Sequence, residues 1–254
     1  MKFKEVKEFL DEKSDFYEQP KFIETDPVQI PHQFSKKEDI EIAGFLTATI
    51  SWGNRKSILK NANTLMQLLD NDPYHFILGH TPKDLSRFTG FVHRTFNDKD
   101  LTFFIAGLQN FYKKNGDMES FFANYHQEDN LHKALHDFKK EFFSIPHLSR
   151  TQKHISDPHK NSAAKRLYMF LRWMVRNSDK GVDLGIWKRI PASILSCPLD
   201  VHSGNTARKL KLLRRKQNDL KAVNELDAIL RKMDPLDPVK YDFSLFGLGV
   251  FEKF

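Results

Sequence analysis

The segment Ile42–Ile50 (IAGFLTATI) carries no charged residue and is apolar nearly throughout. Ser35 precedes it as an N-cap candidate, and Glu38 stands three residues later in the spacing of a capping box, so we predict a helix over about 36–50. A helix that is apolar on most of its sides has to be surrounded by other elements. The chain is therefore predicted to fold around this helix, which ends at Trp52–Arg55 (WGNR), where the glycine can adopt a left-handed turn conformation.

Apolar residues recur at helical spacing through most of the remaining chain. This spacing predicts helices over residues 1–16, 56–69, 98–114, 130–143, 162–176 and 219–232, with short helices at 82–88 and 118–125. We interpret residues 90–97 as a loop or short extended piece, 145–161 as a connection, and 241–251 as an apolar helix or strand. No segment alternates convincingly like a strand, so the predicted fold class is all-α.

The composition limits the kind of protein and of partner. The net charge of +7 favours an acidic partner such as nucleic acid. The single Cys197 excludes an internal disulfide and a four-cysteine zinc or iron–sulfur site, and it favours a reduced, cytoplasmic setting. We find neither a signal peptide nor a membrane span. His132 and His136 are spaced like a metal-binding pair, but no further ligand completes the set, so we expect solvated histidines and no metal.

Lys165 lies near the start of the helix predicted over 162–176. Leu167, Phe170, Leu171 and Met174 repeat at helical spacing on the core side, which leaves Lys165, Arg172 and Arg176 as a basic stripe on the opposite side. Asn161 or Ser162 can cap this helix. The helix N-terminus and the neighbouring arginines disfavour a proton on the lysine amine, so Lys165 is a candidate nucleophile. The alternative interpretation of this stripe is a solvated face.

Asp200 is the second candidate residue. It follows the mostly apolar run Ile194–Leu199 and precedes a basic helix that contains Arg208. A carboxylate in this position is an N-cap, a catalytic group, or both, since a capping aspartate is held ionised and fixed in direction.

Six further segments stand out along the chain, namely Asp26–His32 (DPVQIPH), Ser51–Arg55 (SWGNR), His93–Asn97 (HRTFN), Phe170–Arg176 (FLRWMVR), Cys197–His202 (CPLDVH) and Tyr241–Gly249 (YDFSLFGLG). Through these segments the chain resembles, over nearly its full length, a bacterial family of unknown function, DUF2400.

Two stretches also resemble the helix-hairpin-helix DNA glycosylases, nearest to the archaeal-type 8-oxoguanine glycosylases. Lys165–Trp173 (KRLYMFLRW) is similar to their lysine-bearing helix, and Leu199–His202 (LDVH) is similar to the segment that carries their catalytic aspartate. The resemblance implies one unit of two helical lobes with a central cleft, with 36–145 forming the first lobe and 1–35 with 146–254 the second.

The resemblance also implies a function. The protein is expected to act as a monomer, without a cofactor, on double-stranded DNA that contains a damaged base, an oxidised purine such as 8-oxoguanine. Such an enzyme flips the base into a pocket. Lys165 attacks the sugar C1′ and forms an imine that leads to strand cleavage, while Asp200 stabilises the cationic sugar. The residues expected to contact DNA are Trp52, Asn54, Arg55, His93, Arg94, Lys160, Arg172, His202 and Arg208. For Trp52, a base-stacking role and a core role are weighed equally.

The chain departs from the glycosylase pattern in two places. The hairpin Asp157–Ala164 (DPHKNSAA) contains no glycine, so phosphate binding there requires side chains such as Lys160 or the helix end. The link from Lys165 to Asp200 contains an extra piece, Gly181–Pro191, which makes Lys188 a second candidate nucleophile. Asp242 either lies near the pocket or caps a helix. A non-catalytic nucleic-acid-binding module and an enzyme acting on another nucleic-acid or nucleoside substrate remain the alternatives.

Overall fold

The computed structural model describes residues 2–125 and 129–254 and is mostly helical. Its α-helices are α1 (Phe3–Tyr17), α2 (Pro20–Ile23), α3 (Lys37–Ile50), α4 (Arg55–Leu68), α5 (Pro73–Gly79), α6 (Asp98–Asn115), α7 (Met118–Tyr125), α8 (His132–Phe142), α9 (Lys165–Val175), α10 (Val201–Lys209), α11 (Leu220–Met233) and α12 (Tyr241–Phe251). Within the described residues the only strands are β1 (Val92–His93) and β2 (Phe96–Asn97), which pair as an antiparallel hairpin. The predicted all-α class is confirmed.

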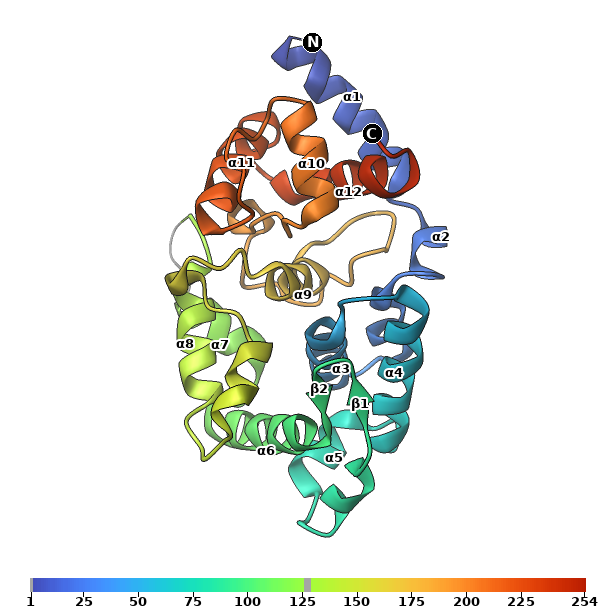
Figure 1. The fold of residues 1–254 in the computed structure, drawn as a ribbon, viewed down its shortest axis with the longest axis vertical. Helices are drawn as coiled ribbons and strands as arrows, with labels where there is room; N and C mark the ends of the chain where they lie inside the picture. The colour runs from blue at the N-terminus through green and yellow to red at the C-terminus, as the bar shows by residue number, and fades with distance from the viewer. Residues whose placement is uncertain (1, 126–128) are drawn as a thin grey trace.

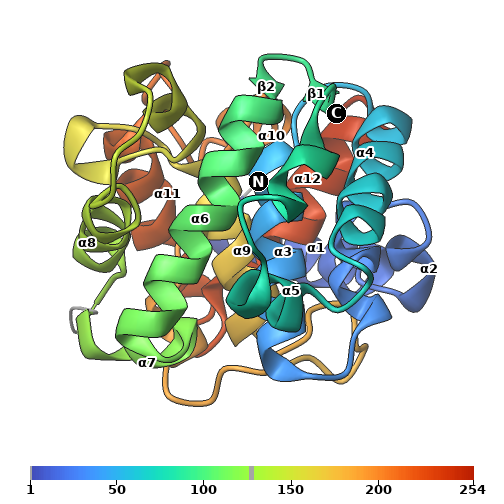
Figure 2. The same cartoon turned by 90° about the horizontal axis from the view of Figure 1, so that it is seen from below.

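Helix α3 lies in the middle of the surrounding helices, as Figure 2 shows. Every residue from Asp39 to Ile50 is buried, which confirms the central position that its apolar sequence predicts. At Gly44 the two helices approach closely, because an added Cβ would lie 2.9 Å from Met174 Cε of α9 and would require that side chain to shift. The predicted Ser35 cap is wrong, because Lys36 directly precedes the helix and no side chain caps it.

Helices from the two ends of the sequence gather at one end of the molecule. Figure 1 shows α1, α10, α11 and α12 at this end, α3 to α8 at the other end, and α9 between them. Helix α1 packs along α12, where Ser14 Oγ donates to Ser244 Oγ (3.1 Å) and Lys13 pairs with Glu252 (2.7 Å). The predicted division into two lobes stays a prediction, and residues 27–33 pack against α3 and α4.

The extra piece after α9 folds back over the C-terminal end of that helix. The N–H groups of Leu184 and Gly185 both donate to Trp173 O (2.9 and 3.1 Å), and Trp187 N–H donates to Met174 O (2.8 Å). The indole N–H of Trp187 donates to the buried Glu41 of α3 (2.7 Å). Carbonyl groups that a helix end leaves free are therefore satisfied by this segment, which also anchors α9 to α3.

Segments at 27–33, 84–88, 149–154, 158–160, 192–194 and 238–240 form short 3₁₀ turns. Two of them, η4 (Ser149–His154) and η5 (Pro158–Lys160), lie in the predicted connection of residues 145–161. In the part of the chain that the structure describes, no helix has both the length and the hydrophobicity needed to cross a bilayer.

Candidate active site

Lys165 is the first residue of α9, which begins three residues later than predicted. The backbone of Asn161 and of Ala164 is left-handed (φ 60° and 41°), so the chain turns sharply just before the helix. Ser162 Oγ accepts from the N–H of Ala164 (3.2 Å) and Asn161 Nδ2 donates to Asp219 (3.1 Å), so the prediction that either of them caps α9 is wrong. The Lys165 side chain therefore leaves the helix at its N-terminal edge.

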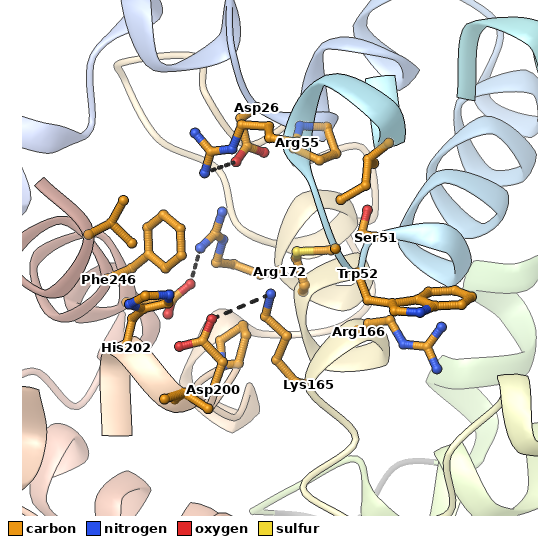
Figure 3. A pocket seen from close by; sticks show the side chains of 18 of the residues that line it. Asp26, Ser51, Trp52, Arg55, Lys165, Arg166, Arg172, Asp200, His202 and Phe246 are labelled. Atoms are coloured by element: carbon orange, nitrogen blue, oxygen red, sulfur yellow. Dashed lines mark hydrogen bonds and ion pairs between the residues drawn. The ribbon is translucent and has the colours of Figure 1, made fainter. Parts of the chain in front are cut away.

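Asp200 caps the N-terminus of α10, as its sequence position predicts. Its Oδ1 accepts from the N–H of Ser203 (2.9 Å), and its own N–H donates to Ser203 Oγ (2.9 Å), which closes a capping box. The second carboxylate oxygen, Oδ2, lies 3.7 Å from Lys165 Nζ. Both side chains keep contact with solvent, since 30% of Lys165 and 20% of Asp200 is exposed. The two residues point toward one another in Figure 3.

Lys165 and Asp200 lie in the wall of a pocket of about 640 Å³. A volume of this size is typical of sites for small organic ligands. The wall is built from α2 and the start of the 3₁₀ turn η1 (Pro27–Gln29), the turn between α3 and α4 with the start of α4, one side of α9, the start of α10 and one side of α12. Six of the predicted site residues line it, namely Trp52, Arg55, Lys165, Arg172, Asp200 and His202.

Two further carboxylates, Asp26 and Asp242, line the pocket, although neither was among the predicted site residues. Asp242, in the first turn of α12, is 6% exposed and pairs with Arg172. Burial raises the pKa of Asp242 to about 6, against the opposing effect of Arg172. Asp26 caps η1 and is 8% exposed, and burial raises its pKa as well. In the sequence, Asp26 is marked only by the proline that follows it. An Asp-Pro pair predicts that the aspartate caps a turn, but it does not predict that the aspartate lines a pocket.

The predicted basic stripe on α9 is wrong, and so is the solvated face offered as its alternative. Arg172 and Arg176 are each only 4% exposed. Arg172 pairs with Asp183 (Nε–Oδ1 3.2 Å) and Asp242, and Arg176 pairs with Glu18, Asp183 and Asp237. Carboxylates from segments far away in sequence supply the counter-charges, which a helical periodicity cannot reveal. Arg172 therefore lies in the pocket wall with its charge paired inside the protein, and it is not the exposed DNA contact that was predicted.

His93 is also misplaced by the prediction. It is 2% exposed, Asn61 Nδ2 donates to its Nδ1 (2.8 Å), and its Nε2–H donates to Trp52 O (3.1 Å). Burial lowers the pKa of His93, which disfavours the charged form that binds phosphate. Its predicted phosphate contact is therefore wrong, and its role is to hold the backbone of Trp52.

Trp52 is half-buried at the edge of the pocket. Its ring packs edge-on against His93 (5.0 Å between centroids), and the Arg166 guanidinium lies over it (4.8 Å). Gly53, at φ 102°, follows it, and an added Cβ there would lie 3.0 Å from the Arg94 side chain. Arg94 itself is exposed in the β1–β2 turn, so it stays available to an external partner.

The remaining predicted DNA contacts lie outside the pocket or on its rim. Asn54 caps α4 by accepting from the N–H of Ser57 (3.2 Å), and Arg208 donates to Arg215 O (2.8 Å) and Asn218 Oδ1 (2.6 Å). Lys160 is exposed in η5, and His202 is exposed on the pocket rim. Lys188 is exposed and does not line the pocket, so it is not brought together with Asp200.

We expected His132 and His136 to be solvated, but both side chains form hydrogen bonds within the protein. His132 Nε2–H donates to Asn224 Oδ1 (2.8 Å), and His136 Nδ1–H donates to Asp157 Oδ1 (3.1 Å). Across residues 2–125 and 129–254, no three side chains of histidine, cysteine, aspartate or glutamate form a group that could hold a metal ion.

Comparison with known proteins gives one match. The model of a family described as "Protein of unknown function (DUF2400)" matches residues 26–251, a range that contains nearly every residue of the pocket wall. No curated protein and no solved structure matches the sequence.

Proposed function

The chain belongs to the DUF2400 family, and we propose that it is a DNA glycosylase with AP-lyase activity that removes an oxidised purine such as 8-oxoguanine through a lysine imine. The observation that carries this proposal is the distance of 3.7 Å between Lys165 Nζ and Asp200 Oδ2 in the wall of a pocket of about 640 Å³. The two residues come from the two stretches that resemble the helix-hairpin-helix glycosylases. An amine beside a carboxylate is the pair of groups that imine chemistry at a sugar carbon needs.

The chemistry follows from these two side chains. The amine of Lys165 attacks C1′ of the nucleotide, the bond from C1′ to the base breaks, and the base leaves with the bonding electrons. Asp200 stabilises the positive charge that develops on the sugar and takes the proton that the amine loses. Asp200 passes that proton to O4′ as the C1′–O4′ bond breaks and the imine forms, and it then takes a proton from C2′ as the C3′–O bond breaks and the 3′ phosphate leaves. The cap to Ser203 fixes the carboxylate before substrate arrives.

Exposed basic side chains support binding of a duplex. Arg94, Lys160 and His202 are exposed, and none has an ion-pair partner among the described residues. Such side chains can contact phosphates, which supply most of the affinity for DNA. Trp52 lies at the pocket edge, where its ring can stack on a base. The proposed enzyme acts as a monomer in the cytoplasm.

Borohydride trapping tests the proposal. Wild type, Lys165→Ala and Lys188→Ala are incubated with duplexes that contain 8-oxoguanine or an abasic site, and borohydride then reduces any imine to a stable adduct. We expect an adduct with wild type and with Lys188→Ala, whose side chain is remote from Asp200, and none with Lys165→Ala. An adduct lost only in Lys188→Ala refutes the assignment of the nucleophile. Salt-dependent binding of DNA without any adduct supports a non-catalytic binding module instead.

A further inference from the structure

Asp26 has one carboxylate oxygen that the fold leaves without a hydrogen bond. Its Oδ1 accepts from the N–H of Val28 (3.1 Å), which caps η1. Its Oδ2 lies 3.7 Å from Nη2 of Arg55, too far for a hydrogen bond. The residue is 8% exposed and lines the pocket. This oxygen keeps contact with the solvent in the pocket, so it can accept a hydrogen bond from a ligand that enters.

Arg55 provides a donor beside this acceptor. It is the first residue of α4, its guanidinium lies over the ring of Phe246 (5.7 Å), and its side chain is 32% exposed. Figure 3 shows Asp26 and Arg55 together at the end of the pocket opposite Lys165 and Asp200, with Arg172 between the two pairs. A base whose sugar lies at Lys165 therefore extends toward Asp26 and Arg55.

We propose that Asp26 and Arg55 form the base-reading end of the pocket, and that together they select a base edge on which an N–H lies next to a carbonyl oxygen. This inference rests on the proposed glycosylase function and adds the residues that choose the base. Asp26 Oδ2 accepts from the N–H, and Arg55 donates to the carbonyl oxygen.

The chemistry of the two side chains gives the selectivity. An ionised carboxylate only accepts hydrogen bonds and a guanidinium only donates them. A ring nitrogen that carries a lone pair is repelled by Asp26, whereas a ring N–H is bound. Oxidation of C8 to a carbonyl group turns N7 into an N–H, so the N7–C8 edge of the oxidised purine fits the pair, whereas the N7–C8 edge of the intact purine does not. Burial raises the pKa of Asp26 against the effects of the Val28 N–H and Arg55, as expected for a carboxylate that lacks a further donor.

Two reactions of the same enzyme separate base reading from the lysine chemistry. Single-turnover rates are measured on a duplex with 8-oxoguanine, which needs base recognition, and on a duplex with a preformed abasic site, which has no base to recognise. The proteins are full-length wild type, Asp26→Asn and Arg55→Gln. Asparagine caps as well as aspartate does, so Asp26→Asn retains the turn but removes the anionic acceptor. We expect each variant to release 8-oxoguanine about 10- to 100-fold more slowly, and Asp26→Asn to cleave the abasic duplex at the wild-type rate.

Asp39→Asn is the matched control. Asp39 is also 8% exposed, accepts one backbone hydrogen bond, from the N–H of Tyr74 (2.8 Å), and has a pKa raised by burial, but it does not line the pocket. It should leave both rates unchanged.

Each result is decisive. Equal losses on both duplexes, or unchanged release of 8-oxoguanine in Asp26→Asn, overturn base reading and leave the proposed function standing. If the wild type cleaves the abasic duplex but does not release 8-oxoguanine, the proposal that the base is an oxidised purine is wrong. Absence of both reactions in wild type refutes the glycosylase function itself.

Discussion

The amine of Lys165 lies 3.7 Å from the Asp200 carboxylate, although the two residues begin two different helices. One carboxylate oxygen is bound to the N–H of Ser203, and the other faces the lysine. The backbone of α10 therefore sets the direction in which the charge is presented to the pocket. Cap and proposed catalytic group are the same side chain, and substitutions can separate the two roles.

Asp200→Asn removes the charge and keeps the cap. We expect release of 8-oxoguanine to fall by about 10²- to 10⁴-fold, because general acid–base and electrostatic assistance are lost, while stability to denaturant is unchanged. Asp200→Ala should lose the same activity and in addition about 1 kcal/mol of unfolding free energy. Single-turnover kinetics and chemical denaturation measure the two effects. A wild-type rate in Asp200→Asn means that Asp200 is only a cap.

Arg172→Met tests the buried ion pairs under the pocket. Removing the guanidinium leaves Asp242 buried without its arginine partner and leaves Asp183 with Arg176 alone, which should cost about 3–5 kcal/mol of unfolding free energy. Arg87→Met is the control, because Arg87 pairs with Asp70 (2.8 Å) where both side chains are partly exposed, and its loss should cost at most about 1 kcal/mol. Equal effects of the two substitutions in a denaturant titration contradict the assigned burial.

The pH dependence of stability should reveal the raised pKa of Asp242. Burial raises this pKa to about 6 from an ordinary value of 3.8, so the native state binds the proton more tightly than the unfolded state does. The wild type should therefore gain stability relative to Asp242→Asn as the pH falls from about 7 to about 4, by up to about 3 kcal/mol. The gain is lost again as the pH rises through 6.

Asp98→Asn is the control for this pH series. The N–H of Gly90 bonds the Asp98 carboxylate and lowers its pKa below the ordinary value of 3.8, so its contribution to stability is lost only in more acidic solution. The difference between wild type and Asp98→Asn should therefore stay constant from pH 7 to pH 4. If the stability difference between wild type and Asp242→Asn is also constant over this pH range, the pKa of Asp242 is not raised.

Salt dependence should identify the basic residues that bind the duplex. Arg94→Ala and Lys160→Ala should each weaken binding of any duplex and lower the slope of log K against log salt by about 1, because one phosphate contact is lost. Lys113→Ala removes an exposed charge from α6, away from the pocket wall, and should change neither quantity. Fluorescence anisotropy at several salt concentrations measures the slopes. If all three variants change the affinity and the slope equally, the effect comes from the overall charge of the protein and not from specific contacts with the duplex.

Local patterns predicted the helices and the cap role of Asp200 well. Periodicity placed α3, α6 and α11 within a few residues, because each buries one regular face or is surrounded by other helices. The approach of Lys165 to Asp200 was expected from the resemblance, and the cap role of Asp200 from its position before a helix. These features depend on neighbours in sequence or on motifs that span a few residues.

Long-range charge pairing could not be predicted in the same way. Arg172 and Arg176 have the spacing of a surface stripe, but Asp183, Asp242 and Glu18 neutralise them inside the protein. No pattern within α9 contains that information. The burial of His93 depends likewise on Asn61 and on the Trp52 backbone, which a nearby helix and turn provide.

The pairing of α1 with α12 has a consequence for how the protein forms. These helices lie at opposite ends of the sequence, and α12 also packs on α10 and carries Asp242. Contacts between distant segments form slowly, because a long loop has to close before they can. During synthesis, α3 to α8 can associate while the later helices are still being made. The pocket wall is thus complete only once α12 has been made and has brought Asp242 to Arg172.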